Sequence, residues 1–273
     1  MIVVKIKDGL GNQMFQYAFA KAFALQTKQK LKLDISNFEW YTLHRYGLHH
    51  FNIQPSFQPA LNIWIRRLKR LYKKIVYYQE ESFAYNPEVF KIKADELHVV
   101  GYFQSQKYFI AYENEIRDAF KIITPLQAKT LETIAYMRTV TAVSIHIRRG
   151  DYIGNPKHET DTSLYYQAAM RYIEKRVPHP VYFIFSDDMP WVKENFSTNF
   201  ETHYVDFNDA LHNFEDLHLM SSCNHHIIAN SSFSWWGAWL NASSEKIVVA
   251  PKIWFTDATI DTRDILPETW ITL

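Results

Sequence analysis

From residue 140 to residue 250, short apolar segments alternate with segments of helical pattern, and this alternation restricts the fold more than any other feature of the sequence. The apolar segments predict strands, and the segments between them predict helices. The strands are expected at 140–147, 181–186, 202–205, 225–229 and 246–250, and the helices at 163–176, 189–196, 209–222 and 233–242. This order is typical of a doubly wound α/β sheet, whose ligands bind just beyond the carboxyl ends of the strands.

The first half of the chain opens on the same pattern. A strand at 2–6 leads through a glycine turn into a helix at 13–27, and a second strand follows at 30–34. These elements imply a parallel sheet, because parallel strands need a crossover connection. Further along, the sequence predicts an irregular region at 36–59, an amphipathic helix at 61–78 and a strand near 97–103.

Together the two patterns predict an α/β chain of two Rossmann-like domains that face each other across a cleft, with residues 1–135 in the first and 136–273 in the second. Hydrophobic residues make up 47% of the 273 positions and charged residues 22%, which excludes a disordered chain. The net charge of +1 gives no reason to expect a nucleic-acid partner. Because Cys223 is the only cysteine and the opening residues read as a strand, we expect a cytoplasmic protein.

The first candidate segment follows the opening strand and contains two of the seven glycines, Gly9 and Gly11. With Asp34 at the end of the next strand, they resemble a dinucleotide-binding fingerprint, which leaves an NAD-linked enzyme as one interpretation. The third glycine of that fingerprint is missing, because Met14 occupies its place. The other interpretation is that the turn presents Asn12 and backbone N–H groups to the cleft.

The second candidate segment, SIHIRRGDY, spans residues 144–152. Side chains alternate along a strand, so His146 and Arg148 are expected on one face at its carboxyl end. Arg149 is expected on the other face, where Asp151 could pair with it. The planar fork of an arginine suits a phosphate, and the strand-end position of Arg148 favours anion binding over a simple surface ion pair.

The third candidate segment, IIANSSFSWWGAW, spans residues 227–239 and leads from a buried strand into a helix. Ser231 or Ser232 is the expected N-cap of that helix. The same geometry can bind an anion, because free N–H groups, hydroxyls and the positive helix end converge there. We expect the tryptophans to lie in the core, with Gly237 allowing the helix to pack closely on the sheet.

Three acidic residues complete the candidate set. Asp187 and Asp188 directly follow the 181–186 strand, and we favour Asp187 as a ligand contact, whereas Asp188 could cap the next helix. Asp216 is either an ordinary solvent-facing charge or an acceptor for the two donors of a guanine edge. No D-x-D motif and no cysteine or histidine spacing of a metal site is present, so we expect no metal cofactor.

The segments DGLGNQMFQYAFA, SIHIRRGDY and IIANSSFSWWGAWL, in this order, resemble the α-1,2-fucosyltransferases of glycosyltransferase family 11, and FSDD and FEDLHLMSSC add to the likeness. The resemblance extends to about residue 251. It implies a GT-B-type fold and the inverting, metal-independent transfer of L-fucose from GDP-fucose to the 2-hydroxyl of a galactose residue on an oligosaccharide acceptor. It also implies that the C-terminal domain binds the GDP-sugar and that the N-terminal domain faces the acceptor.

The resemblance further implies roles for individual residues. Arg148 is similar to the arginine that holds the diphosphate, and with His146 and Asn12 it is expected to take part in catalysis. The expected contacts to GDP-fucose are Gly11, Asn12, His146, Arg148, Asp187, Asp216, Ser231, Ser232 and Phe233. A catalytic base near the acceptor hydroxyl is left open between Asp8, Asp151 and Asp187.

The segment 61–78 keeps a non-catalytic interpretation open, that of a membrane- or glycan-binding protein. Its six basic residues lie opposite Trp64 and Ile75 on a helix, and such a helix can rest on an anionic leaflet or pack on its own domain. Membrane contact and transfer are compatible if the acceptor oligosaccharide is lipid-linked. We expect the acceptor to be chosen by the 36–59 region, where Trp40, Tyr41, His44 and Arg45 form a mixture that suits sugars.

Overall fold

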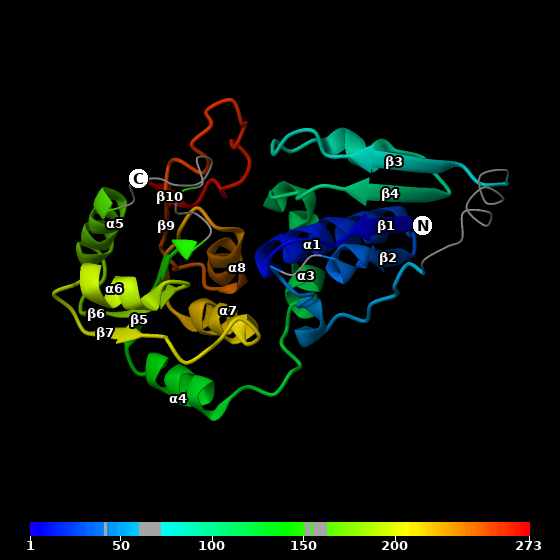
Figure 1. Cartoon of the computed structure of the whole chain (residues 1–273). Helices are drawn as coiled ribbons and strands as arrows, with labels where there is room; N and C mark the ends of the chain where they lie inside the picture. Colours follow the sequence, from blue (N-terminus) through cyan, green and yellow to red (C-terminus); the bar gives the residue numbers. More distant parts are fainter. Residues whose placement is uncertain (41–42, 60–71, 151–153, 155–162) are drawn as a thin grey trace. The chain divides into compact units, whose positions relative to one another are not determined.

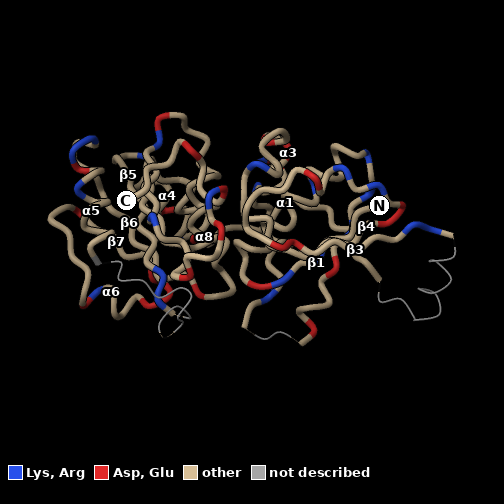
Figure 2. Tube along the Cα trace, turned by 90° about the horizontal axis from the view of Figure 1, so that it is seen from above, with Lys and Arg blue, Asp and Glu red and all other residues tan. Residues whose placement is uncertain are grey.

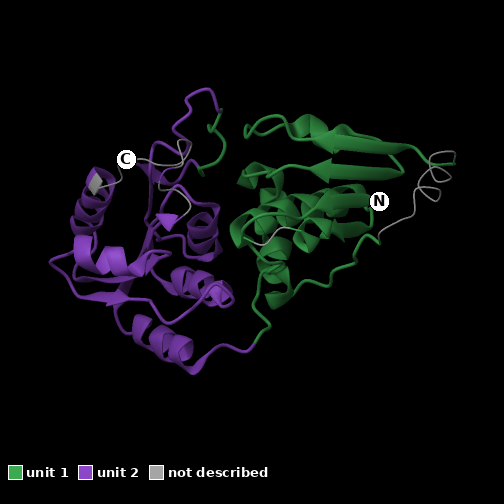
Figure 3. Ribbon diagram, in the orientation of Figure 1, with its two compact units in different colours: residues 1–124, 261–267 green, residues 125–260, 268–273 purple. Residues whose placement is uncertain are grey.

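The computed structural model describes residues 1–40, 43–59, 72–150, 154 and 163–273. The chain divides into two compact units (Figure 3). Unit 1 comprises residues 1–124 and 261–267, and unit 2 comprises residues 125–260 and 268–273. Each unit has a sheet of parallel strands with helices packed on it (Figure 1), which confirms the predicted α/β class.

The first boundary lies upstream of helix α4 (Ala128–Met137), whereas the sequence placed it between residues 135 and 136. The difference arises because α4 is amphipathic and packs its apolar face on unit 2. Its buried residues Ile134 and Met137 share a hydrophobic cluster with Phe183.

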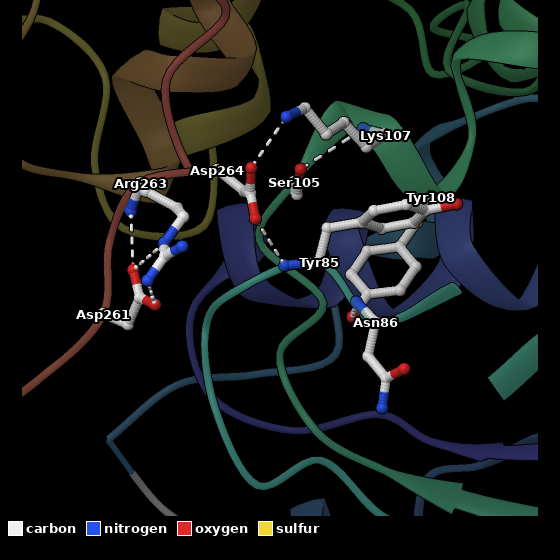
Figure 4. A network of polar contacts seen from close by, with 8 residues as sticks. All are labelled: Tyr85, Asn86, Ser105, Lys107, Tyr108, Asp261, Arg263 and Asp264. Atoms are coloured by element: carbon white, nitrogen blue, oxygen red, sulfur yellow. Dashed lines mark hydrogen bonds and ion pairs between the residues drawn. The ribbon is translucent and has the colours of Figure 1, made fainter. Parts of the chain in front are cut away.

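A short segment near the C-terminus, residues 261–267, also belongs to unit 1. The Asp264 carboxylate accepts a hydrogen bond from the Tyr85 backbone N–H at 2.8 Å and pairs with Lys107 Nζ at 2.7 Å (Figure 4). These partners precede Asp264 by 179 and 157 positions. No motif in the 252–273 tail predicted this anchor.

The sheet of unit 1 has the strand order β2-β1-β4-β3. Its strands are β1 (Ile2–Lys5), β2 (Leu31–Asp34), β3 (Ile75–Gln79) and β4 (Glu96–Val100), and its α-helices among the described residues are α1 (Leu10–Thr27) and α3 (Glu113–Ala119). Helix α1 connects β1 to β2 and is buried on nearly every side, as its apolar sequence predicted. Single 3₁₀ turns occur at Ser36–Glu39, Leu48–His50, Pro87–Lys91, Gln106–Tyr108 and Ile110–Tyr112.

Strand β3 contradicts part of the helix that was predicted at 61–78. Residues 75–79 pair in parallel with β4, from Ile75 opposite Glu96 to Gln79 opposite Val100. Their sequence, IVYYQ, is rich in β-branched and aromatic residues, which favour a pleated surface. The greater part of the predicted basic helix, residues 61–71, lies outside the described residues.

The sheet of unit 2 has the strand order β10-β9-β8-β5-β6-β7. Its elements after α4 are β5 (Thr141–Ile147), α5 (Ser163–Glu174), β6 (Pro180–Ser186), α6 (Met189–Asn195), β7 (Thr202–Tyr204), α7 (Asn213–Ser222), β8 (His225–Ile227), α8 (Ser232–Leu240), β9 (Val248–Ala250) and β10 (Ile271–Thr272). The chain first builds outward from β5 through β6 and β7, then returns and builds outward through β8, β9 and β10. All strands and helices predicted between residues 140 and 250 are present, and β10 was not foreseen.

Alternation along β5 gives the two faces of this sheet different neighbours. Val143, Ile145 and Ile147 join the hydrophobic cluster that contains α5. Ala142 belongs to the cluster on the opposite face, which contains residues of α4 and α7. His146 shares the face of Ala142, because it lies an even number of residues along the strand.

Helix α8 packs against helix α7, and Gly237 makes this close approach possible. A Cβ atom at Gly237 would lie 2.9 Å from the Met220 side chain of α7. Gly237 was predicted to allow close packing of the helix on the sheet. The close contact is instead with another helix, α7. Trp235 and Trp236 are fully buried, as expected for core residues.

Within the described residues, no helix is both long enough and apolar enough to cross a bilayer. Basic and acidic positions are interspersed along the described part of the chain (Figure 2), and the formal net charge is +1.

Candidate active site

The strand order of unit 2 places a candidate ligand site at the carboxyl ends of β5 and β8. These two strands are neighbours, and the connections that leave them run to opposite sides of the sheet. Open α/β sheets bind their ligands at such a point, because the diverging loops leave a crevice there. His146 lies at the end of β5, and Ser231 lies in the loop that leads from β8 into α8.

His146 is a buried and neutral member of this site. Burial, with a further contribution from Arg148, lowers the pKa of His146 to about 3. Its Nδ1 atom is buried and has no hydrogen-bond partner within the described part of the chain. Its ring centroid lies 5.8 Å from that of Phe233 in α8. A buried ring nitrogen without a partner, next to a helix N-terminus, is a group that a ligand could satisfy.

Arg148 follows β5 and is oriented by an ion pair. Its Nη1 atom lies 3.1 Å from Asp187 Oδ2, and both side chains are about one-quarter exposed, at 25% and 23%. The other oxygen of Asp187 accepts a hydrogen bond from the Arg149 backbone N–H at 2.9 Å. A Cβ atom at Gly150 would lie 2.3 Å from Asp187 Oδ2, so the carboxylate occupies the space that a side chain there would need. Asp187 therefore ties the end of β6 to the turn after β5.

Arg149 turns to different partners, as the alternation of the strand predicted. Its Nε atom lies 3.2 Å from Asp188 Oδ2, and its guanidinium lies 3.4 Å from the centre of the Trp191 ring. Asp188 is also the N-cap of α6 and accepts a hydrogen bond from the Trp191 N–H. The predicted partner of Arg149, Asp151, lies outside the described residues.

The N-terminus of α8 supplies the second part of the site. Ser231 is the N-cap, and its Oγ accepts a hydrogen bond from the Phe233 N–H at 3.3 Å. Ser232 and Phe233 form the first turn and are half-buried. The predicted capping role of Ser231 is confirmed, and the cap aims the positive end of a nine-residue helix at the carboxyl edge of the sheet.

Asp216 lies in the first turn of α7, the helix that packs beside α8. Burial raises the pKa of Asp216 to about 7, the neighbouring Glu215 adds to the rise, and a hydrogen bond from Asn208 opposes it. That bond runs from Asn208 Nδ2 to Asp216 Oδ1 at 2.7 Å. Asp216 is thus a half-buried carboxyl group that changes charge near neutral pH, and the alternative of an ordinary solvent-facing charge is wrong.

In unit 1, Asn12 lies in the first turn of α1, at the carboxyl end of β1. Its Oδ1 atom accepts a hydrogen bond from Gln104 Nε2 at 2.7 Å. Gly11 is buried beside it. Gln13 holds the same turn, because its side chain bonds the backbone of Asp8, Arg45 and Gly47.

Gly9 and Asp34 show ordinary structural roles. A Cβ atom at Gly9 would make only van der Waals contact, 3.6 Å from the His44 ring, and its φ of −66° suits any residue. The left-handed residue of this turn is Asp8, with φ 64°. Asp34 Oδ1 accepts a hydrogen bond from the Ser36 N–H, as in a simple turn.

Two further residues of unit 1 were missed by sequence reasoning. Gln104 contacts Asn12 directly, and the carboxylate of Glu80 accepts hydrogen bonds from the backbone of residues 102 and 103. The signal that could have found Gln104 is its position, just beyond the carboxyl end of a predicted strand.

The histidine pair in β8 is structural. His226 Nδ1 bonds Ser144 Oγ and its Nε2 bonds Asn241, whereas His225 accepts a hydrogen bond from the Ile247 N–H. Within the described ranges, no group of three or more potential ligand residues is arranged to hold a metal ion.

Solved fucosyltransferases share the fold of this chain. The crystal structure of the NodZ alpha-1,6-fucosyltransferase soaked with GDP-fucose matches with a TM-score of 0.50 at 14% identity, over 88% of this chain and 92% of NodZ. A structure of Arabidopsis thaliana FUT1 in complex with GDP matches with a TM-score of 0.52 at 13% identity, over 91% of this chain and 70% of FUT1. The likeness confirms the predicted GT-B-type α/β fold.

Curated relatives are glycosyltransferases. An alpha-1,2-colitosyltransferase of Escherichia coli is 34% identical over 99% of this chain and 98% of its own length. The O-antigen biosynthesis glycosyltransferase WbnK of Escherichia coli is 32% identical over 98% and 99%. A galactoside alpha-(1,2)-fucosyltransferase 1 of Bos taurus is 26% identical over 89% of this chain and 67% of its own length.

The family model described as glycosyl transferase family 11 matches residues 1–273. This match replaces the NAD-linked and non-catalytic interpretations with that of a glycosyltransferase. The chain belongs to glycosyl transferase family 11.

Proposed function

We propose that the protein transfers L-fucose from GDP-fucose to the 2-hydroxyl of a galactose residue on an oligosaccharide. The observation that carries this proposal is the geometry at the carboxyl ends of β5 and β8, where Arg148 lies near the neutral His146 and the His146 ring lies beside Phe233 in the first turn of α8. Such a set suits a diphosphate, because a guanidinium and free helix N–H groups both attract its charge. Relatives named as α-1,2-transferases and fold neighbours solved with GDP or GDP-fucose support the choice of linkage and donor.

In this proposal, unit 2 binds the nucleotide part of the donor. Arg148 and the first turn of α8, with Ser231, Ser232 and Phe233, receive the two phosphates. Asp187 holds Arg148 in place, and Asp216 accepts the donors of the guanine edge when it is ionised.

The proposed reaction is a single displacement that inverts the anomeric centre without a metal. As the bond from the sugar to the diphosphate breaks, negative charge develops on GDP. Arg148 and the α8 N–H groups lie in fixed positions and stabilise that charge, a type of contact whose loss typically costs about 10²–10³ in rate.

A base for the acceptor hydroxyl has three candidates. Asp187 already binds Arg148 and the Arg149 N–H, an arrangement that suits orientation more than proton transfer. Asp151 lies outside the described residues, and Asp8 lies at the carboxyl end of β1 near Lys7, at 3.8 Å. We propose Asp8 as the first candidate to replace by asparagine.

Colitose is a second candidate for the transferred sugar, because the 34%-identical relative is named for it. Colitose is fucose without its 3-hydroxyl group. A site that hydrogen-bonds that hydroxyl would reject the deoxy sugar strongly, whereas a site that does not would accept both.

The experiment that tests the function is transfer by the purified chain from GDP-fucose and GDP-colitose to lactose, N-acetyllactosamine and galactosyl-N-acetylgalactosamine. We expect a product in which the sugar is α-linked to the galactose 2-position, identified by NMR. No transfer to any of these acceptors, with no binding of GDP in titration calorimetry, would contradict the proposal.

We also propose a cytoplasmic protein whose acceptor can be lipid-linked. Trp40, which is 87% exposed, and the exposed Arg45 lie within the 36–59 region that we expect to choose the acceptor. Co-sedimentation with anionic vesicles at low and high salt tests the membrane part, and binding that does not change with salt would contradict an electrostatic contact.

A further inference from the structure

Asn12 and Gln104 meet at the point in unit 1 that corresponds to the ligand edge of unit 2. In the order β2-β1-β4-β3, strands β1 and β4 are parallel neighbours in the middle of the sheet, so their carboxyl ends lie at the same edge. Asn12 follows β1 and Gln104 follows β4, so both lie beyond the carboxyl ends of the central pair. Gln104 is 6% exposed and donates from Nε2 to Asn12 Oδ1 at 2.7 Å.

This bond decides which end of the Asn12 amide is available. Because Oδ1 accepts from Gln104, the remaining polar group is the Nδ2 amino group, which can only donate. No described residue accepts a hydrogen bond from it. Gln104 Oε1 is buried and has no partner among the described residues, so the side-chain hydrogen bond that Gln104 makes there is the one from Nε2 to Asn12.

The backbone has a left-handed residue on each side of the pair. Phe103, which directly precedes Gln104, has φ 52°, and Asp8, in the turn before Asn12, has φ 64°. An aromatic residue such as Phe103 seldom adopts this left-handed conformation, whereas aspartate adopts it more readily. It persists only where the surroundings enforce it, and it is concentrated at functional sites.

Glu80 enforces the strained turn. Its carboxylate accepts hydrogen bonds from the Tyr102 N–H at 2.6 Å and the Phe103 N–H at 3.0 Å. A Cβ atom at Gly101 would lie 2.5 Å from Glu80 Cβ, so glycine is needed for this approach. The Phe103 ring stacks on Phe19 of α1, with centroids 3.8 Å apart. The turn is thus fixed at both ends before Gln104 reaches Asn12.

We propose that Gln104 is the positioning residue for Asn12, turning its amide so that Nδ2 donates to an oxygen of a sugar bound at the carboxyl ends of β1 and β4, with Glu80 holding the loop that carries Gln104. The inference rests on the proposed function and on the part in catalysis that the family resemblance implies for Asn12. It adds residues that act through Asn12 and need not touch the substrate themselves.

A double-mutant cycle on kcat tests whether Gln104 acts through Asn12. We expect Asn12→Ala to lower kcat by about 10², as for the loss of a donor used in the transition state. Gln104→Ala should lower it by about tenfold, the scale of one neutral hydrogen bond. The double variant should be no slower than Asn12→Ala, because a positioning contact has no value once its target is gone. Losses that multiply in the double variant would overturn the inference.

Gln104→Glu tests the direction of the hydrogen bond. An ionised carboxylate can only accept, so it would bind Asn12 Nδ2 and turn the amide away from the substrate. We expect kcat to fall about tenfold or more, with the affinity for GDP, which lacks the sugar, within twofold of wild type. Wild-type turnover in this variant would mean that Asn12 already donates to Gln104, and would overturn the inference.

Gln79→Glu is the matched control, because it makes the same change at an exposed position at the end of β3. Its kcat should equal that of wild type, and a fall as large as that of Gln104→Glu would overturn the inference by assigning the effect to charge alone. If Gln104→Ala lowers the melting temperature, Gln104→Met takes its place in the double-mutant cycle, because methionine fills a similar volume. An inactive wild-type chain that binds no GDP would overturn the proposed function together with this inference, whereas an active chain with unaffected variants would overturn the inference alone.

Discussion

The Arg148 guanidinium is paired with the Asp187 carboxylate, so a substitution of Arg148 could change stability as well as activity. The pair with Asp187 is partly exposed, so it contributes at most about 1 kcal/mol to stability. The guanidinium can therefore be removed without a large change in folding.

We predict that Arg148→Ala and Arg148→Lys both lower transfer from GDP-fucose by about 10²–10³, because lysine keeps the charge but loses the planar fork. The measurements are kcat/KM and the thermal melting temperature, which should stay near that of wild type. Arg171→Ala removes an exposed arginine from α5 and should leave both values unchanged. An active Arg148→Ala enzyme would refute the assignment.

Asp216 makes a second prediction at this scale, through pH. With its pKa raised to about 7, the carboxyl group is largely protonated at pH 6 and ionised at pH 8. If only the ionised form accepts the guanine donors, the affinity for GDP should fall about tenfold for each pH unit by which the pH lies below the pKa of Asp216. Calorimetric titration with GDP from pH 5.5 to 8.5 measures this slope, and Asp216→Asn should abolish it.

The contribution of Asp216 to the free energy of unfolding should change with pH in the opposite direction to the affinity for GDP. The folded chain keeps the Asp216 proton up to about pH 7, whereas the unfolded chain releases it at its ordinary, lower pKa. The folded state therefore binds more protons in this window, and the contribution of Asp216 to stability falls as pH rises through it. Asp216→Asn should gain stability relative to wild type at pH 8 compared with pH 4. A GDP affinity that does not change with pH would contradict the proposed guanine contact.

The strand-end rule predicted His146, Arg148, Asp187 and Ser231 from the sequence, because each follows a clear apolar strand. It could not predict which of them pair. The partner of Arg148 comes from β6, and the partner of Asn12 comes from a loop 92 residues away. Such contacts depend on which strands are neighbours in the sheet. The sequence of a single chain predicts where strands lie but not the order in which they pair.

At the scale of elements, α8 combines a structural cap with a proposed phosphate contact, and one position can separate the two roles. Aspartate is as good an N-cap as serine, and its charge is stabilised by the helix dipole. The same charge would repel a diphosphate. We therefore predict that Ser231→Asp keeps or raises the melting temperature while weakening GDP binding by at least tenfold.

Two variants complete this test. Ser231→Ala should cost about 1 kcal/mol of stability, the usual value for a lost cap. Asn86→Asp adds the same charge at the cap of a 3₁₀ turn in unit 1 and should leave GDP affinity unchanged. If Ser231→Asp binds GDP as tightly as wild type, the phosphates are not received at α8.

Elements were predicted well where the hydrophobic period was regular and poorly where it was mixed. The regular alternation from 140 to 250 gave the correct strands and helices. The segment 61–78 has apolar residues at helical spacing, yet IVYYQ at 75–79 is also a good strand, and pairing with β4 decided in favour of the strand. Gly237 was marked correctly as a close approach, but only the packing of α8 on α7 identified Met220 as its neighbour.

At the scale of the whole molecule, the division of the chain was the feature least accessible from sequence. The alternating pattern of the second half continues to residue 250, and nothing in the tail suggests that residues 261–267 belong to unit 1. The reason lies in one carboxylate. Asp264 has a side chain that is only 12% exposed, and it satisfies the backbone N–H of Tyr85 while it pairs with Lys107.

We predict that Asp264→Ala lowers the melting temperature by several degrees, because it leaves a half-buried backbone N–H without its acceptor, at a cost of about 1–3 kcal/mol. Lys107→Ala should have a smaller effect, since Lys107 is 44% exposed and a partly exposed ion pair is weak. Asp261→Ala is the matched control, because it removes a carboxylate three residues away whose partner, Arg263, is 75% exposed (Figure 4).

Limited proteolysis separates a loosened segment from a general loss of stability. If Asp264 anchors residues 261–267 to unit 1, cleavage within this segment should rise in Asp264→Ala at temperatures well below its melting point, and it should not rise in Asp261→Ala. Equal cleavage and equal melting in the two variants would show that the segment is held by its remaining contacts, of which buried Ile265 is the strongest candidate. Ile265→Ala would then be expected to release the segment, because the removal of a fully buried side chain takes away the main remaining contact between the segment and unit 1.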